Sequence, residues 1–358
     1  MATIGPGPGR ILLTVQHPGH VHFFKHVYRE LQADGHSVAV IGRNETVVED
    51  LLEEYGMEHR LVGETPDGLT ALAATQARYE AALYRYARRF SPDIIAGIGG
   101  VAAAHVARLV GARGIVFTDT EHATLSNALA IPFADLVCTP DCFHKDLGSK
   151  QYRYPGYHEL AYLTPERFTP DSSVLDAVGV GPQETFVILR LTAWNALHDV
   201  GEGGLAGAVD IVEQLEATGA RVLITASVDL PSELESRRAA VPPHRLHDLL
   251  ANAALFIGEG ATTAAESAVL GTPAVYVNTL EAGTLAELEN RYGLLFGFHG
   301  QDRHRRGLEQ ALEILSEGDD TRWERRRRRL LDDKCDTTAV VKRLLTEGQA
   351  PDIVEAAG

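Results

Sequence analysis

The chain has 358 residues, 45% of them hydrophobic and 23% charged, which suits a folded protein of about two domains. Asp and Glu outnumber Lys and Arg by 49 to 33, the wrong charge balance for a general nucleic-acid binder. No run of about 18 apolar residues predicts a membrane span. Residues 1–10 lack the basic and apolar regions of a signal peptide. We therefore expect a cytoplasmic protein with neither a nucleic-acid partner nor a transmembrane segment.

Short apolar runs alternate with helical periodicity through the first half of the chain. The predicted order is strand Arg10–Gln16, helix Val21–Asp34, strand Ser37–Ile41, helix Glu45–Tyr55, strand Glu58–Val62, helix Leu69–Phe90, strand Asp93–Ile98, helix Ala102–Val110, and strands Gly114–Thr118 and Leu136–Thr139. Strands that alternate with helices form a parallel sheet covered on both faces.

A segment rich in tyrosine and proline, Gln151–Thr169, breaks this rhythm and is predicted to connect two domains. The alternation then restarts with strand Thr185–Leu189, helix Leu205–Thr218, strand Arg221–Thr225, helix Leu246–Ala253, strand Ala254–Ile257, helix Thr262–Leu270 and strand Pro273–Val277, with only helices after it. We expect an α/β fold of two doubly wound Rossmann-like domains, residues 1–160 and 161–345, with a tail at 346–358. The domains are expected to face an interdomain cleft, the usual ligand site of such folds.

Three histidines follow the first predicted strand, in the segment Gln16–Phe24. His17 and His20 are candidate catalytic residues because imidazole exchanges protons near neutral pH. Gly19 lies in the same turn and is a candidate for binding the substrate. The alternative is that these rings only cap or pack the next helix. No acidic or cysteine partner stands nearby, so we expect no metal site.

Two acids follow the fifth predicted strand. Asp119 and Glu121 lie at the end of a sheet where catalytic groups are expected. Either is a candidate general acid or base, and capping of the next helix is the alternative.

The first strand of the second half is followed by Arg190, Thr192 and Asn195. A guanidinium group binds phosphate through two parallel hydrogen bonds, and the other two side chains can donate hydrogen bonds. The three are candidate binding residues for a phosphorylated ligand.

The strongest local motif is the segment Ala254–Pro273, which predicts a strand, a glycine turn and a helix. Glycines allow a ligand close to the backbone, and free amides at a helix N-terminus attract anions. A carboxylate one turn into the helix can accept hydrogen bonds from the hydroxyls of a ribose. The candidate binding residues are Gly258, Glu259, Gly260, Thr262, Thr263 and Glu266. The alternative is a tight turn that holds no ligand.

This segment resembles the donor-nucleotide motif of GT-B glycosyltransferases and of UDP-N-acetylglucosamine 2-epimerases. The resemblance implies that Gly260, Thr262 and Thr263 hold the diphosphate and that Glu266 holds the ribose. The epimerases also carry an aspartate after the fourth strand, whereas this chain has Ala96–Gly100 without an acid there. The chain therefore departs from the epimerase pattern.

The start H-P-G-H-V-H-F-F and the later L-R-L-T-A-W-N-A-L-H-D resemble a largely archaeal family of uncharacterised proteins, domain of unknown function 354. The resemblance extends over about residues 10–345 and implies the GT-B fold. It names no reaction.

These motifs favour a metal-independent glycosyltransferase that needs no cofactor and uses a nucleotide-diphosphate sugar, with UDP as the expected nucleotide and an unknown acceptor. A nucleotide-sugar epimerase or hydrolase is the first alternative, and a non-catalytic binding subunit on a GT-B scaffold is the second. The basic run Arg325–Arg329 is expected to be either a solvated helix face or a peripheral contact with an anionic membrane.

Overall fold

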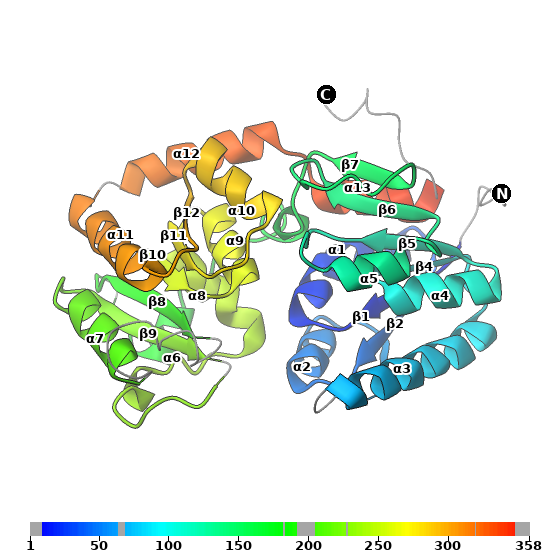
Figure 1. Ribbon diagram of the computed structural model, residues 1–358, viewed down its shortest axis with the longest axis horizontal. Helices are drawn as coiled ribbons and strands as arrows, with labels where there is room; N and C mark the ends of the chain where they lie inside the picture. The colour runs from blue at the N-terminus through cyan, green and yellow to red at the C-terminus, as the bar shows by residue number, and fades with distance from the viewer. Residues whose placement is uncertain are drawn as a thin grey trace. The chain divides into compact units, whose positions relative to one another are not determined.

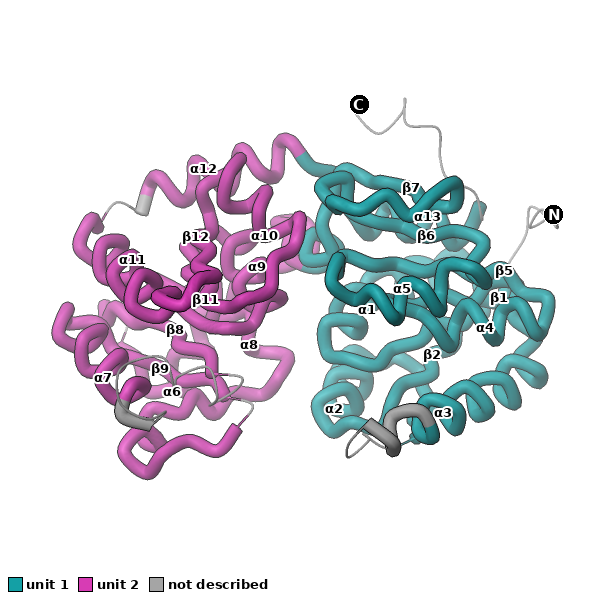
Figure 2. Tube along the Cα trace, in the orientation of Figure 1, with its two compact units in different colours: residues 1–162, 334–358 teal, residues 163–333 magenta. Residues whose placement is uncertain are grey.

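The structure is a computed structural model that describes residues 9–63, 69–181, 183–191, 205–226, 228–318 and 320–347 (Figure 1). The chain forms two compact units (Figure 2). Unit 1 comprises Met1–Tyr162 and Lys334–Gly358, and unit 2 comprises Leu163–Asp333. None of the described helices is both long and apolar enough to cross a lipid bilayer.

Unit 1 contains a sheet of seven strands in the order β3-β2-β1-β4-β5-β6-β7, and every pairing is parallel. The strands are β1 (Arg10–Val15), β2 (Ser37–Arg43), β3 (His59–Val62), β4 (Ile94–Ile98), β5 (Arg113–Phe117), β6 (Leu136–Pro140) and β7 (Gln151–Tyr154). The helices of this unit are α1 (Pro18–Ala33), α2 (Thr46–Glu54), α3 (Leu69–Phe90), α4 (Val101–Val110), α5 (Thr124–Ala130), η1 (Glu159–Ala161) and α13 (Thr337–Glu347).

One face of this sheet packs against α3 and α4. Leu12, Ile41 and Ile95 from the neighbouring strands β1, β2 and β4 form a buried cluster with Tyr79 and Leu83 from α3. Because both faces of a parallel sheet are covered, its inner strands are apolar along most of their length. This explains why the alternation of apolar runs and helices was a reliable guide to the first six strands.

The segment predicted as a connector, Gln151–Thr169, contains the boundary between the two units, between Tyr162 and Leu163, but its first four residues form a strand that was not predicted. Residues of β7 pair with β6 in parallel, from Gln151 opposite Val137 to Tyr154 opposite Pro140. Only Tyr154 of this strand is buried. An edge strand with one buried residue leaves no apolar pattern in the sequence.

The C-terminal helix α13 belongs to unit 1, although the sequence analysis assigned it to the second domain. The hydroxyl of Thr337 donates to the carbonyl of Tyr157 at 2.8 Å, and that of Thr338 donates to Ala161 at 2.7 Å. The ammonium of Lys342 lies 2.9 Å from the carboxylate of Asp34. These contacts are formed far apart in the sequence, so local patterns do not predict them.

Unit 2 contains a five-stranded parallel sheet in the order β12-β11-β10-β8-β9. Its strands are β8 (Phe186–Leu191), β9 (Arg221–Ala226), β10 (Leu255–Gly258), β11 (Ala274–Val277) and β12 (Leu295–Phe298). Its helices are α6 (Val174–Val178), α7 (Leu205–Glu216), η3 (Glu235–Arg237), η4 (Pro243–Arg245), α8 (Leu246–Asn252), α9 (Ala261–Leu270), α10 (Gly283–Glu287), η5 (Leu288–Tyr292), α11 (Arg303–Glu317) and α12 (Asp320–Asp333).

Strand β12 was not predicted, because only helices were expected after β11. It is a run of four residues, Leu-Phe-Gly-Phe, and periodicity alone does not distinguish so short an apolar run from part of a helix.

In each unit the strand order reverses near the middle of the sheet, between β1 and β4 in unit 1 and between β8 and β10 in unit 2. Ligands of doubly wound sheets bind beyond the carboxyl ends of strands at such points. The prediction of two doubly wound α/β units is confirmed, and most candidate residues follow the strands at these two points.

Candidate functional site

In unit 2, helix α9 begins with amides that form no hydrogen bond to the residues that the structure describes. Its N-cap is Gly260, which has no side chain to cap the helix. The first intrahelical bond runs from the amide of Ala264 to the carbonyl of Gly260 at 3.0 Å. Within the described residues, the amides of residues 261–263 donate to no acceptor, and Thr262 is exposed. An uncapped helix start with outward amides is an anion-binding feature.

The side chain of Arg190, at the end of β8, lies over the glycines that precede this helix. A Cβ atom on Gly258 would lie 2.6 Å from the carbonyl oxygen of Arg190, and one on Gly260 would lie 3.3 Å from its Nε. Position 258 therefore needs glycine for steric reasons, whereas a side chain at position 260 would require the Arg190 side chain to shift by a few tenths of an ångström. Burial lowers the pKa of Arg190, and the carboxylate of Glu266 opposes this effect. Because a guanidinium stays protonated in proteins, a cation lies beside the open amides of α9.

The carboxylate of Glu266 is buried inside unit 2. Its Oε1 accepts a hydrogen bond from Nε2 of His247 at 2.9 Å, with side-chain exposures of 5% and 2%. The role of Glu266 as a ribose ligand remains a prediction. His247 was not identified from the sequence, since the two residues lie 19 positions apart on different helices.

Glu259 is also buried, and its backbone forms a hydrogen bond with the residue that follows β11. Its carbonyl accepts from Nδ2 of Asn278 at 2.9 Å. Burial, and secondarily the Glu259 carboxylate, raise the pKa of Tyr276 to about 12. Thr263 is buried within the first turn of α9. Thr192 and Asn195, the other predicted binding residues, lie outside the described residues.

In unit 1, the two candidate histidines are fixed at the start of α1. The helix begins at Pro18, earlier than the predicted Val21, because His17 caps it by accepting from the amide of Gly19 at 3.2 Å. Nδ1 of His20 accepts from the amide of Gln16 at 3.3 Å. The Gly19 amide is therefore already used by His17.

These contacts decide the tautomers of the neutral rings. Because Nδ1 of His17 and of His20 accepts a backbone hydrogen bond, the proton of each neutral ring is on Nε2. Burial lowers the pKa of His20 to about 3, with further contributions from His17 and His158. His20 is therefore neutral at physiological pH and offers a hydrogen-bond donor rather than a lone pair.

Asp119 pairs with His158, a partly buried contact that the sequence did not predict. Its Oδ2 lies 3.1 Å from Nδ1 of His158, and its Oδ1 accepts from the hydroxyl of Thr120 at 2.9 Å. Burial alone would raise the pKa of Asp119, but His158 and Thr120 hold it well below its usual range. Asp119 is therefore a carboxylate near neutral pH.

His158 is the group that responds to this carboxylate. Burial alone would lower its pKa, but the charge of Asp119, its hydrogen bond and Glu159 raise it overall. Its Nε2 is buried and has no hydrogen-bond partner among the described residues. A carboxylate on Nδ1 and a free Nε2 is the arrangement that orients an imidazole for proton transfer.

Glu121 is held by the backbone that follows β6. Its Oε1 accepts from the amide of His144 at 3.2 Å, and its carbonyl accepts from Nζ of Lys145 at 2.7 Å. The side chain is 7% exposed. Its surroundings fit a structural contact better than a group that meets substrate, and its catalytic role stays a prediction.

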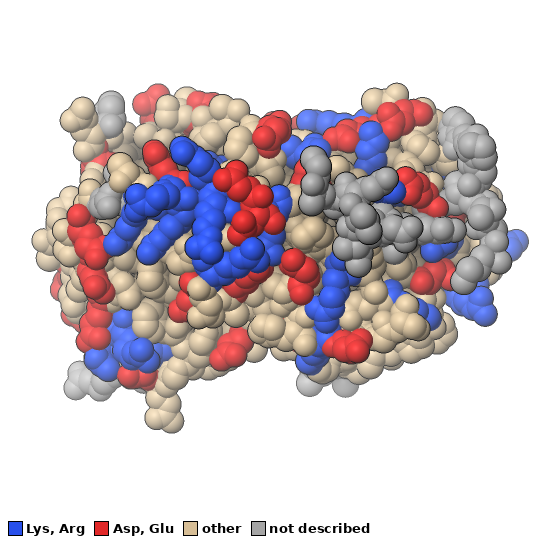
Figure 3. Space-filling view, turned by 90° about the horizontal axis from the view of Figure 1, so that it is seen from above, with Lys and Arg blue, Asp and Glu red and all other residues tan. Residues whose placement is uncertain are grey.

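The basic run lies on α12 in unit 2. Arg325, Arg328 and Arg329 are exposed and form no ion pair among the residues that the structure describes. Lys and Arg side chains gather on the face of the protein shown in Figure 3, beside acidic ones. The solvated helix face and the peripheral membrane contact both stay predictions.

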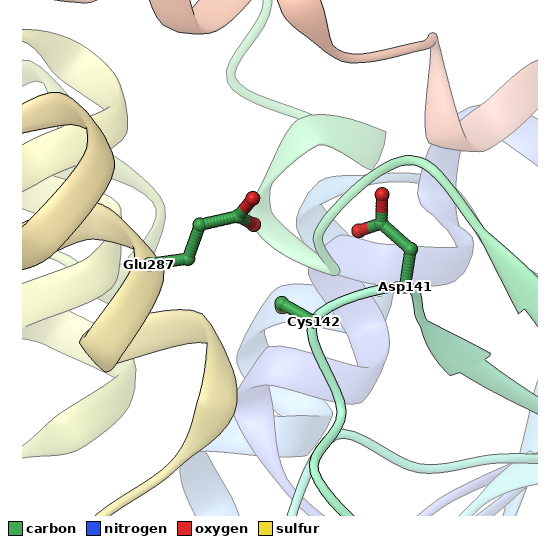
Figure 4. Close-up of side chains that lie close together, drawn as sticks. All are labelled: Asp141, Cys142 and Glu287. Carbon is green, nitrogen blue, oxygen red and sulfur yellow. The ribbon is translucent and has the colours of Figure 1, made fainter.

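Figure 4 shows Asp141 and Cys142, which follow β6, and Glu287, the last residue of α10. The first two belong to unit 1 and the third to unit 2. We build no metal site on them, because neither unit supplies the set by itself.

Comparisons with solved structures show the fold. The spinosyn forosaminyltransferase SpnP matches with a TM-score of 0.63 and 18% identity, over 95% of this chain and 100% of that one. A putative UDP-N-acetylglucosamine 2-epimerase from Listeria monocytogenes matches with a TM-score of 0.70 and 12% identity, over 97% and 99% of the two chains. Both likenesses support the GT-B fold that the sequence motifs implied.

Comparisons of the amino-acid sequence identify a relative and a family. The uncharacterized protein MJ0665 of Methanocaldococcus jannaschii is 22% identical over 268 residues, which cover 72% of this chain and 78% of that protein. The family described as "Protein of unknown function (DUF354)" matches residues 10–285. The chain therefore belongs to the DUF354 family, as its histidine and arginine motifs indicated.

Proposed function

We propose that the protein is a glycosyltransferase that takes its sugar from a nucleoside diphosphate, with UDP as the expected nucleotide, and that it needs no metal ion. The observation that carries the proposal is the uncapped start of α9 with the guanidinium of Arg190 beside it. The helix dipole and a fixed cation stabilise the charge of a diphosphate as it leaves. They supply the positive charge that a divalent metal supplies in other transferases.

Proton transfer from the acceptor hydroxyl is assigned to the imidazoles of unit 1. His158 suits this role better than His17 or His20, because Asp119 accepts its Nδ1 proton, so that in the neutral form of the ring the lone pair is on Nε2. Since Nε2 is buried here, the proposal requires that acceptor binding uncovers it. His20 would then donate a hydrogen bond from its own Nε2.

An epimerase or hydrolase of nucleotide sugars is the second candidate, supported by the likeness to the putative epimerase. One observation weighs against it. Strand β4 ends in Ile98, followed by Gly99 with a φ of +61° and Gly100, so no acid stands where the epimerase pattern has one.

The experiment is calorimetric titration of the full chain with UDP and UDP-N-acetylglucosamine, followed by incubation with the sugar nucleotide alone. The proposal predicts that both ligands bind and that the donor remains intact without an acceptor. Rapid release of UDP, or formation of an epimer without acceptor, would support the second candidate. If no nucleotide or nucleotide sugar raises the melting temperature, the non-catalytic alternative is favoured, since a ligand of the native state must stabilise it.

A further inference from the structure

A second binding feature lies wholly within unit 2. A cavity of about 200 Å³ is bordered by β11, β12, α10 and η5. It is smaller than the roughly 300–1,000 Å³ pockets that enclose drug-sized ligands. Its size therefore suits one ring-sized group rather than a whole nucleotide.

Three side chains at this cavity, Tyr276, His299 and Glu289, each have one polar atom that forms no hydrogen bond with a described residue. Tyr276 is 1% exposed, and its hydroxyl forms no hydrogen bond with any residue in the described part of the chain. Nδ1 of His299 lies 2.7 Å from the carbonyl of Asn278, which can only accept, so Nε2 of the neutral ring carries a lone pair. Glu289 accepts the amide of Gly297 at 3.1 Å through Oε1, which leaves Oε2 without a partner.

Two of these groups converge on the same space. A Cβ atom on Gly297 would lie 2.9 Å from Nε2 of His299 and 3.2 Å from Oε2 of Glu289. A side chain at position 297 would collide with His299, so glycine allows both acceptors to lie this close to the backbone of β12 at the edge of the cavity. Two acceptors that border one cavity are satisfied by a ligand that brings hydrogen-bond donors.

The charge of the cavity narrows the class of ligand. The carboxylates of Glu281 and Glu289 border it, and no lysine or arginine does. A negatively charged lining repels a carboxylated sugar and favours a cationic group, because charge-assisted hydrogen bonds are the stronger ones.

The cavity is also aligned with the predicted diphosphate site. In the sheet, Gly258 pairs with Tyr276, and Tyr276 pairs with Gly297. Neighbouring strands lie about 4.8 Å apart, so Gly297 is about 10 Å from the glycine turn before α9. A sugar attached to a diphosphate at that turn can reach the cavity.

We propose that this cavity holds the sugar of the donor and selects a sugar that carries a free, protonated amine. The inference rests on the proposed function and adds the substrate class. Glu289 and His299 receive the ammonium, and the hydroxyl of Tyr276 contacts a neighbouring hydroxyl group of the sugar.

The test is calorimetric titration of the full chain at about pH 6.5, where an aliphatic amine is protonated, with UDP, UDP-glucose, UDP-glucosamine and UDP-N-acetylglucosamine. We expect UDP-glucosamine to bind at least about tenfold more tightly than UDP-glucose or the N-acetylated sugar. In Glu289→Gln the preference disappears, while the affinity for UDP stays the same. Gln keeps the oxygen that accepts the Gly297 amide, so this variant should fold.

Two further variants and a control complete the design. Tyr276→Phe removes only the hydroxyl group. His299→Asn keeps an N–H that can donate to the Asn278 carbonyl but removes Nε2 together with its lone pair. Both should reduce the preference for the amine. Glu313→Gln, an equal charge change at an exposed position of α11, should leave it intact.

The two possible failures are distinguishable. If UDP binds and the three sugar nucleotides bind equally, or if Glu289→Gln keeps the preference, the inference is overturned and the proposed function stands. If UDP itself does not bind, the proposed function fails and the inference fails with it.

Discussion

Replacement of Arg190 by Gln tests the diphosphate site directly. The guanidinium lies beside Gly260 and the open amides of α9, where it would form charge-assisted hydrogen bonds to a phosphate. Hydrogen bonds to charged groups contribute about 1.5–3 kcal/mol each. A loss of about 2 kcal/mol corresponds to roughly thirtyfold weaker binding of UDP.

The assay is calorimetric titration of wild type and variant with UDP, UMP and uridine. The loss should be largest for UDP, smaller for UMP and absent for uridine, because uridine has no phosphate. Arg237→Gln serves as the control, since Arg237 is in the same unit and pairs with Glu216 at 2.7 Å on the surface. Unchanged UDP affinity in Arg190→Gln, or an equal loss for uridine, would refute the reasoning.

Three other perturbations follow from buried contacts. His247→Ala leaves the Glu266 carboxylate buried without its donor, so unfolding in urea should show a loss of about 3 kcal/mol, and an unchanged midpoint would contradict a structural role for the pair. The raised pKa of His158 stabilises the protein below the ordinary value of 6.5, and that stability is lost as the pH rises through the folded-state value. In His158→Asn the amide still donates to Asp119 but has no proton to lose over this pH range. The urea midpoint of this variant should therefore fall less than that of wild type between about pH 6 and 9. If the midpoints of both proteins change in parallel with pH, the proposed effect of His158 on stability is disproved. Gly258→Ala places a Cβ 2.6 Å from a backbone oxygen and should cost about 1–3 kcal/mol in thermal unfolding, whereas an unaltered melting temperature would show that the backbone yields freely.

The elements that the sequence predicted well are those with strong local patterns. The long amphipathic helix at Leu69–Phe90 and the buried strands of the first sheet appear where expected. The two missed strands, β7 and β12, are four residues each and mostly unburied. Short edge strands depend on the neighbour they pair with, and their own residues carry little of that information.

The residues of the candidate sites also fall into two groups, those predicted from local motifs and those that only the structure identified. The glycine turn before α9 and the histidine turn before α1 were visible as motifs, because a helix start needs specific residues within a few positions. The partners of those motifs were not visible. His158 meets Asp119 from 39 positions away, and His247 meets Glu266 from 19.

The sequence alone determined most of the order of strands and helices, the two-unit α/β architecture, and the turns where a ligand's phosphates are expected. Those features depend on hydrophobic period and on backbone geometry over a few residues. Only the tertiary structure decided which nitrogen of each histidine keeps its proton, which carboxylates are paired, and that Glu289, His299 and Tyr276 border one cavity. Protonation and complementarity depend on atoms brought together from distant segments, and a linear pattern does not contain those distances.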